Sequence, residues 1–244
     1  MKILGIIPAR YASTRFPGKP LVDIGGKSMI QRVYAQCKKA ILLTDVVVAT
    51  EDERIMTHVQ NFGGKVEMTS DQHLTGTDRV AEVAQKYPDF DAYINIQGDE
   101  PFIAPEAIDI LCQKMTENKP QIATLIKKIT DISLLQNPNA VKVVADKNNY
   151  ALYFSRQPIP FLRNQPNLES WIEVHDFYQH IGIYGFSKKT LAEIGILSPG
   201  ILEMAESLEQ LRWMENGYHI LTAITDYQSI AIDTPEDLVG LSPK

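Results

Sequence analysis

A short apolar strand at the start of the chain, followed at once by a cationic loop, most constrains what this sequence can fold into. Residues 3–7 are almost wholly apolar, which is the pattern of a strand buried on both faces of a parallel sheet. Pro8 has no backbone N–H to donate to a neighbouring strand, so the strand is expected to end there. The run therefore predicts a buried strand of an α/β fold.

The loop after this strand holds three cations, Arg10, Arg15 and Lys19, among small and turn-forming residues. Ligands of open α/β folds bind at the carboxyl edge of the sheet, where such a loop lies, so the cations suit a bound polyanion. The loop is not a P-loop, because Gly18-Lys19 is followed by Pro20, which offers no hydroxyl to a metal. We interpret it as a triphosphate site. The alternative is a surface loop in which cations cluster by chance.

Strand and helix patterns then alternate through the first half of the chain. Apolar runs predict strands over 45–50, 66–69 and 92–97. Helical spacing predicts helices around 30–37, over 51–62, from Thr77 onward and over 105–115, with Thr77 as an N-cap. This alternation predicts a parallel sheet with right-handed crossovers, flanked by helices.

The second half breaks this alternation. Strands are expected over 122–128, 140–145, 151–155, 181–186, 219–224 and 229–232, and a helix over 202–216 with Met204, Leu208, Leu211 and Met214 facing inward. No crossover-length helix separates the first three strands, which favours antiparallel pairing. Residues 161–175 indicate an excursion or a dimer contact. Because the sequence contains no linker, we expect one α/β domain over 1–244. Its sheet is expected to be mixed and mainly parallel. The segment 120–190 is expected to hold antiparallel strands and a dimer contact.

The overall charge argues against some classes of partner. Lys and Arg number 24 against 30 Asp and Glu, a net charge of −6, so a nucleic-acid partner is not expected and the positive loop suits a small anionic ligand. No apolar run approaches the length of about 20 residues that spans a membrane, and the apolar start is too short for a signal peptide. We therefore expect a cytoplasmic protein without membrane insertion. Cys37 and Cys112 lie in helical patterns and predict buried thiols.

Two acids that each follow a predicted strand predict a metal site. Asp99 and Asp233 would lie at the sheet edge that holds the cationic loop, if both strands are parallel members of the sheet. Two carboxylates facing a phosphate pocket suit Mg²⁺ completed by substrate phosphates and water. The alternatives are that each Asp caps a helix, although Thr234-Pro235 already supplies a cap after Asp233, or that Glu100 replaces Asp99 as the ligand.

Eight sequence blocks resemble one enzyme family. They cover residues 8–21, 76–79, 95–101, 137–142, 151–156, 180–185, 208–212 and 233–237. In this order, and over nearly the whole chain, they resemble the sugar-acid cytidylyltransferases, in particular the branch that activates 3-deoxy-manno-octulosonate (Kdo). The resemblance implies a Rossmann-like nucleotide-diphospho-sugar transferase fold, a homodimer, and the formation of CMP-Kdo and pyrophosphate from CTP and Kdo for lipopolysaccharide biosynthesis. Thr75 departs from the pattern, because relatives commonly have Ser there.

The resemblance also implies roles for single residues. Catalytic roles fall to Arg10, Arg15, Lys19, Asp99 and Asp233, the last two as Mg²⁺ ligands while the sugar's anomeric hydroxyl attacks the α-phosphate in line. The expected CTP-binding residues are Pro8, Ala9, Arg10, Arg15, Lys19, Thr75, Gly76 and Thr77. The expected sugar-binding residues are Gln97, Arg156, His180, Tyr184, Glu209 and Gln210. Arg156 is expected to bind the sugar's carboxylate.

Without the resemblance, ordinary interpretations of the sugar-binding residues remain open. His180 would be a surface or core histidine, Tyr184 would be core packing, and Glu209-Gln210 would form a solvated helix face. Two alternative functions also stay open. The first is a cytidylyltransferase for another acidic sugar, an amino-substituted Kdo or a sialic acid. The second is a nucleotide-binding regulator that has lost catalysis.

Overall fold

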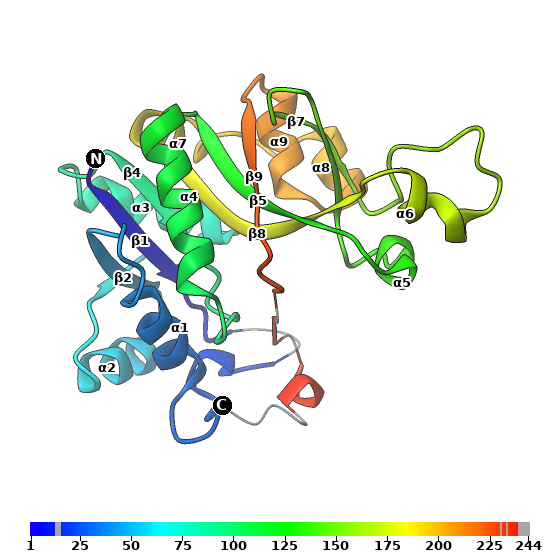
Figure 1. Cartoon of the computed structure of the whole chain (residues 1–244). Helices are drawn as coiled ribbons and strands as arrows, with labels where there is room; N and C mark the ends of the chain where they lie inside the picture. Colours follow the sequence, from blue (N-terminus) through cyan, green and yellow to red (C-terminus); the bar gives the residue numbers. More distant parts are fainter. Residues whose placement is uncertain (13–15, 230, 233, 239–244) are drawn as a thin grey trace.

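One sheet organises the whole molecule (Figure 1). The structure is a computed structural model that describes residues 1–12, 16–229, 231–232 and 234–238. Its nine described strands are β1 (Ile3–Pro8), β2 (Asp45–Thr50), β3 (Val66–Met68), β4 (Ala92–Asn95), β5 (Ile122–Lys128), β6 (Lys142–Ala145), β7 (Ala151–Ser155), β8 (Tyr178–Ser187) and β9 (Ile220–Ile224). Along the main path the strands run in the order β3-β2-β1-β4-β8-β5-β9, and β6 and β7 extend the sheet from β8.

The helices lie between the strands in the sequence. The described α-helices are α1 (Met29–Cys37), α2 (Glu53–Asn61), α3 (Gly76–Lys86), α4 (Pro105–Asn118), α5 (Ile132–Gln136), α6 (Trp171–Val174), α7 (Lys188–Ile194), α8 (Ile201–Glu206) and α9 (Glu209–Glu215). Short 3₁₀ turns are η1 (Lys19–Leu21), η2 (Leu168–Ser170) and η3 (Pro235–Leu238). No helix of the described ranges is long and apolar enough to cross a membrane.

Two hydrophobic cores lie on the two faces of the sheet. Side chains of α1, α2 and α4 pack on one face, and side chains of α3, α7 and α9 pack on the other. The strands serve both cores because successive side chains point to opposite faces: Ala92 and Ile94 of β4 belong to the first core and Tyr93 to the second. This two-faced burial explains the nearly continuous apolar runs of the parallel strands. Cys37 and Cys112 are buried thiols, as predicted.

The sheet is mixed but mainly parallel, which confirms the predicted fold class. β1 pairs in parallel with β2 and β4, and β5 pairs in parallel with β9. The exception along the main path is β8, which lies antiparallel between β4 and β5. The predicted antiparallel pairing is confirmed for β6 with β7, whereas β5 pairs with β8 and β9.

The structure corrects two expected elements near the C-terminus. The single helix expected over 202–216 is two helices, because Ser207 adopts a left-handed conformation (φ 52°) that ends α8. Leu208 and Leu211 are buried as expected, but Met204 is 65% exposed because the break turns α8 away. The strand expected over 229–232 is also wrong, since its described residues belong to no strand.

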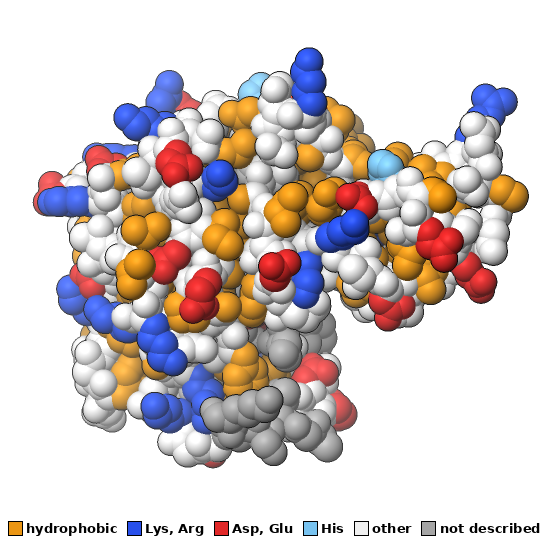
Figure 2. All heavy atoms as spheres, in the orientation of Figure 1, with side chains coloured by type: hydrophobic (Ala, Val, Ile, Leu, Met, Phe, Trp, Pro, Cys, Tyr) orange, Lys and Arg blue, Asp and Glu red, His pale blue; other side chains and the backbone are white. Residues whose placement is uncertain are grey.

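A small arm projects from the sheet (Figures 1 and 2). It comprises residues 129–136 and 161–177 and includes α5 and α6. Its own cluster of Ile129, Leu135, Trp171 and Phe177 holds it together. The excursion expected over 161–175 is therefore packed locally, against the segment that follows β5.

Candidate active site

A cavity of about 230 Å³ lies where the carboxyl ends of β1 and β4 meet. We call it the β1–β4 cavity. Adjacent parallel strands bring the loops that follow them to the same edge, so residues distant in sequence meet here. The cavity is lined by Pro8, Ala9, Arg10, Lys19, Pro20, Gly76, Gln97, Gly98 and Asp99. The structure thus brings together most of the residues that the sequence assigned to the nucleotide and the metal. Arg15 and Asp233 lie outside the described residues.

The closeness of the two loops depends on Gly98. A Cβ atom added at this position would lie 2.5 Å from the carbonyl oxygen of Pro8, far inside van der Waals contact with backbone. Only glycine therefore lets the segment after β4 pass against the end of β1. This close passage places Asp99 beside the cationic loop.

Lys19 and Asp99, which both line the cavity, form an ion pair. The Nζ atom of Lys19 lies 2.9 Å from Oδ2 of Asp99 and also donates to the carbonyl oxygen of Ile232 at 2.9 Å. The backbone N–H of Ile232 donates in turn to the carbonyl oxygen of Asp99 (3.0 Å). Three segments that are far apart in sequence are therefore joined at this point: the opening loop, the loop after β4, and the segment that precedes Asp233.

Asp99 and Glu100, the two alternative metal ligands, have different surroundings. The Asp99 side chain is 29% exposed and lines the β1–β4 cavity. Glu100 is 5% exposed and accepts hydrogen bonds from the hydroxyls of Tyr227 (2.9 Å) and Ser229 (2.7 Å), while burial raises its pKa. Glu100 is thus occupied in a separate network, and Asp99 is the acid that faces the cavity.

The donor set fits magnesium better than a metal held by protein alone. Within the described ranges, no group of three or more His, Cys, Asp or Glu side chains could hold a metal ion. Mg²⁺ commonly takes one or two carboxylates and completes its shell with phosphates and water. A carboxylate beside phosphate-binding cations meets that requirement.

The N-terminus of α3 forms another wall of the cavity. Thr75, rather than the expected Thr77, is its N-cap, because the hydroxyl of Thr75 accepts from the N–H of Asp78 (3.1 Å) and the Asp78 carboxylate accepts from the N–H of Thr75 (3.0 Å). Arg10 reaches the same loop and donates to the carbonyl oxygen of Leu74 (3.4 Å). The positive end of α3 therefore faces the cavity, which favours an anionic ligand.

A buried ion pair behind the cavity was not predicted from the sequence. Arg79 is 1% exposed, and its guanidinium lies 2.7 Å from the Glu51 carboxylate. The other oxygen of Glu51 accepts from the backbone N–H of Tyr11 in the opening loop (3.2 Å). Glu51 directly follows β2, which is parallel to β1, so its position at this edge was available from the strand pattern. The pair ties the opening loop to α3.

A second group of polar residues continues from the cavity across β8. It contains Asn95, Gln97, Thr124, His180 and Tyr184 from the sheet and its loops, with Glu209 and Gln210 from α9, and we call it the polar face. Gln97 lines the cavity and donates from Nε2 to the carbonyl oxygen of Gly182 in β8 (2.9 Å). Thr77 follows the cavity residue Gly76 and donates to the Glu209 carboxylate (2.7 Å). Residues assigned to the base and to the sugar are thus in direct contact.

Three buried polar atoms of the polar face have no hydrogen-bond partner among the described residues. They are Oδ1 of Asn95, the hydroxyl of Tyr184 and Nε2 of Gln210. Asn95 and Tyr184 are opposite each other in the β4–β8 ladder. Burial raises the pKa of Tyr184 well above its usual value and also raises the pKa of Glu209. Unpaired polar groups are costly when buried, so each of these atoms calls for a partner, such as a water or a ligand, that the described residues do not supply. Asn95 was not predicted, because an Asn within an apolar strand carries no local signal.

Arg156 lies beside the break between α8 and α9. Its guanidinium donates to the carbonyl oxygens of Glu206 (2.6 Å), Pro138 (3.0 Å) and Ser207 (3.2 Å). These bonds use three of its five N–H groups. The structure therefore gives Arg156 a part in holding the junction that carries Glu209 and Gln210. The carboxylate contact expected from the sequence stays a prediction.

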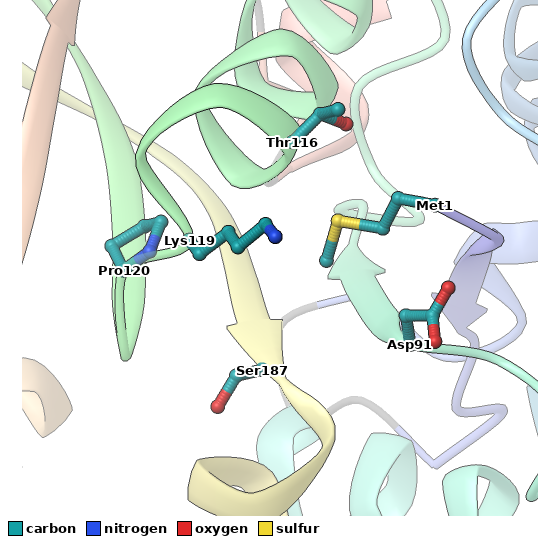
Figure 3. A pocket seen from close by; sticks show the side chains of 6 residues that line it. All are labelled: Met1, Asp91, Thr116, Lys119, Pro120 and Ser187. Carbon is teal, nitrogen blue, oxygen red and sulfur yellow. The ribbon is translucent and has the colours of Figure 1, made fainter.

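A larger cavity of about 560 Å³ lies at the opposite edge of the sheet (Figure 3). Met1 and Asp91 precede β1 and β4, and the side chains of Met1 and Lys119 reach into the space (Figure 3). The Asp91 carboxylate accepts from the N–H of Lys2 (2.7 Å). Among the described residues expected to bind nucleotide, sugar or metal, none lines this cavity.

Comparison with known proteins places the chain in a family. A sequence model of the family described as Cytidylyltransferase matches residues 4–223. The chain is 53% identical to the 3-deoxy-manno-octulosonate cytidylyltransferase of Cytophaga hutchinsonii, over 99% of this chain and 97% of that protein. It is 54% identical to the protein of the same name from Parabacteroides distasonis, over 98% and 96% of the two chains.

Solved structures agree with this placement. A structure of CMP:2-keto-3-deoxy-manno-octonic acid synthetase complexed with CTP superposes with a TM-score of 0.90 at 43% identity, over 98% of this chain and 95% of that one. A cytidylyltransferase from Leptospira borgpetersenii, with a TM-score of 0.62 at 16% identity over 97% and 83% of the two chains, shares the fold alone. The resemblance inferred from the sequence blocks is therefore confirmed: this chain belongs to the cytidylyltransferase family, among the 3-deoxy-manno-octulosonate cytidylyltransferases.

Proposed function

We propose that this nucleotidyltransferase activates Kdo with CTP and releases CMP-Kdo and pyrophosphate. The observation that carries the proposal is the continuity of the β1–β4 cavity with the polar face, through Gln97 and the Thr77–Glu209 hydrogen bond. A phosphate-binding end and a hydroxyl-binding end are thereby adjacent. The names of the similar proteins supply the identities of the two substrates.

At the nucleotide end, the residues act by charge and position. Arg10 and Lys19 line the cavity, and with Arg15 they would hold the triphosphate and stabilise the charge that collects on the leaving pyrophosphate. The loop of Thr75, Gly76 and Thr77, with the backbone of Pro8 and Ala9, is the proposed site for cytosine. In-line attack of a sugar hydroxyl on the α-phosphate requires mainly that both groups be fixed in line.

We assign the metal to Asp99 and Asp233. Asp99 supports this because it offers a carboxylate to the cavity while Glu100 is hydrogen bonded elsewhere. Mg²⁺, when bound, neutralises phosphate charge and lowers the pKa of an attacking hydroxyl. Lys19, whose amine already lies 2.9 Å from Asp99, keeps a cation close to that carboxylate and orients it in the cavity.

At the sugar end, the polar face supplies directional contacts. Gln97, His180, Tyr184, Glu209 and Gln210 would bind the hydroxyls of the sugar, and Arg156 its carboxylate. The unpaired hydroxyl of Tyr184 and the unpaired amide nitrogen of Gln210 support this assignment. A ligand rich in hydroxyls would supply the partners that these buried atoms lack.

Pyrophosphate release tests the proposal directly. The assay contains CTP and Mg²⁺ with Kdo, an amino-substituted Kdo or a sialic acid, each in turn. We expect the highest kcat/KM with Kdo, and loss of activity when the metal is chelated. Faster turnover of a sialic acid would assign a different substrate. No pyrophosphate with any sugar acid would favour a nucleotide-binding regulator.

We further propose that the protein is a homodimer that works in the cytoplasm and supplies lipopolysaccharide assembly. Residues 1–244 would form one domain, which the single sheet of the described strands supports. The arm supports a subunit contact because Phe161 is 75% exposed and Val174 is 56% exposed. Light scattering on the purified protein and on Phe161→Glu tests this. We expect a dimer for the first and a larger monomer fraction for the second.

A further inference from the structure

An irregularity in the sheet lies at the centre of the polar face. In the β5–β8 ladder Thr124 is opposite Tyr184, but the next residue, Leu125, is opposite Ile181. Gly182 and Ile183 therefore form a bulge in β8 with no counterparts in β5. Bulges of this kind commonly redirect side chains next to binding sites. Here the bulge separates His180 from Tyr184.

The Thr124 side chain contacts the backbone of β8 at Ile181 and Ile183 and the ring of His180. Thr124 is 0% exposed. Its hydroxyl oxygen lies 2.8 Å from the carbonyl oxygen of Ile183 and 3.2 Å from that of Ile181. It also lies 3.0 Å from Nε2 of His180. One hydroxyl thus contacts two acceptors and one imidazole nitrogen.

The number of protons available determines which group donates in each of these contacts. A hydroxyl has one proton, and a carbonyl oxygen cannot donate. If the hydroxyl donated to His180 instead, two carbonyl oxygens would face an oxygen at 2.8 and 3.2 Å with no proton between them. If it donates to a carbonyl, its lone pair can accept a proton carried by Nε2 of His180. Only the second arrangement makes the imidazole contact and a carbonyl contact both favourable.

We propose that Thr124 is a positioning residue for sugar recognition, which holds His180 as the Nε2–H tautomer and so leaves Nδ1 as an acceptor for a hydroxyl of the sugar acid. The inference rests on the proposed function, because it assigns the ligand of His180. A hydroxyl partner at Nδ1 is chemically distinct from the carboxylate contact proposed for Arg156.

The surroundings of His180 support a neutral ring with a fixed orientation. Burial lowers the pKa of His180 to about 3, so the ring carries one proton near neutral pH. The ring packs edge-to-face on Phe154, with centroids 5.1 Å apart, and lies 5.2 Å from the ring of Tyr184. Two residues further along β8, a Cβ atom added at Gly182 would meet nothing within 4 Å, so the bulge borders open space.

Two substitutions at one position test the inference. Thr124→Val keeps the shape of the side chain and removes the hydroxyl, and Thr124→Ser keeps the hydroxyl as the matched control. For each full-length protein, pyrophosphate release gives separate KM values for Kdo and CTP. Two-bond ¹⁵N–¹H correlation spectra of histidine-labelled protein give the tautomer, with the His180 signal identified by its absence from His180→Gln.

We expect the wild type and Thr124→Ser to show the Nε2–H pattern at His180. In Thr124→Val that pattern should be lost, and the KM for Kdo should rise about tenfold while the KM for CTP changes less than about twofold. A purely structural role would instead move both KM values or the melting temperature alone. An Nδ1–H pattern in the wild type, or an unchanged KM for Kdo in Thr124→Val, would overturn the inference.

Failure of the inference is distinguishable from failure of the proposed function. If no sugar acid is turned over by the wild type, the proposed function fails. If Kdo is turned over normally and Thr124→Val behaves as the wild type, this inference alone fails. If Thr124→Val does not fold, the tautomer of the wild-type protein and the response of Thr124→Ser still decide it.

Discussion

The β1–β4 cavity, which is the proposed phosphate end, and the polar face, which is the proposed sugar end, use different parts of the same sheet. The phosphate end is made by loops that follow parallel strands β1 and β4, and its cations come from one short stretch of chain. The sugar end is made on the antiparallel strand β8 with contributions from β4, β5 and α9. A triphosphate needs cationic side chains and backbone groups close to its phosphates, and one contiguous loop supplies both. A sugar needs many directed hydrogen bonds, which require several elements.

The largest expected effect lies at the phosphate end. Asp99→Asn keeps the shape of the side chain but removes the charge that faces Lys19 and the proposed metal. We expect kcat for pyrophosphate release to fall about 10³-fold with an unchanged fold by circular dichroism. Asp71→Asn, at an exposed acid, is the control. Near-normal kcat in Asp99→Asn would remove that residue from the metal site.

Glu51→Gln, at the ion pair behind the β1–β4 cavity, should lower the free energy of unfolding. It leaves the Arg79 guanidinium, 1% exposed, without its ionic partner, and loosens Tyr11 in the opening loop. We expect the free energy of unfolding to drop by about 3 kcal/mol in urea titrations. The double variant with Arg79→Met should recover part of this loss, because no unpaired charge remains buried. A single-variant change near zero would show that the pair is solvated.

Arg156→Ala should affect the binding of Kdo without affecting the binding of CTP. Loss of its bonds to Pro138, Glu206 and Ser207 loosens the junction before α9, and removes the proposed carboxylate contact. We expect the KM for Kdo to rise about tenfold with the KM for CTP unchanged. Arg156→Lys, which keeps the charge but loses the planar group, should recover little. An equal loss of CTP affinity would assign Arg156 to the nucleotide end.

Lowering the pH should lower the free energy of unfolding, because His180 is held neutral in the folded protein. Burial lowers the pKa of His180 to about 3 from 6.5, so between these values the unfolded chain binds a proton that the folded chain does not. The free energy of unfolding therefore falls as the pH drops through this range. His180→Gln should show a shallower fall between about pH 7 and about pH 5 in urea titrations. Equal slopes would mean that His180 protonates freely in the folded protein.

The smallest effects concern the cap of α3. Thr75→Ala removes the acceptor for the N–H of Asp78 and should cost about 1 kcal/mol of stability, with a higher KM for CTP. Thr75→Ser keeps the hydroxyl and should match the wild type in both measurements. A loss in Thr75→Ser equal to that in Thr75→Ala would show that the methyl group, rather than the cap, is what matters.

That Arg10, Lys19 and Asp99 would lie together could be predicted from the sequence for a physical reason. Loops that follow adjacent parallel strands begin at one edge of the sheet, so the strand pattern places Arg10 and Asp99 at the edge where the loop that carries Lys19 begins. The same rule points to Glu51, which follows β2. Arg79 had a weaker signal, a cation within the inward stripe of an amphipathic helix.

The sugar end was accessible only through resemblance to a family. The role of Thr124 depends on a bulge in a strand more than fifty residues later, and nothing in its own neighbourhood marks it. The break at Ser207 was missed because the apolar spacing of 204, 208 and 211 fits one continuous helix. The apolar run before Asp233 suggested a strand, but Ile232 is buried against Ile24 and Met29 instead.

The position of β8 has a consequence for synthesis on the ribosome. β4 and β5 both precede β8 in sequence, yet neither pairs with the other, because β8 lies between them. A nascent chain therefore emerges with two strand edges that have no partner until residues 178–187 leave the exit tunnel. Translation that stalls before this point exposes both edges, and unpaired edges readily associate with other chains.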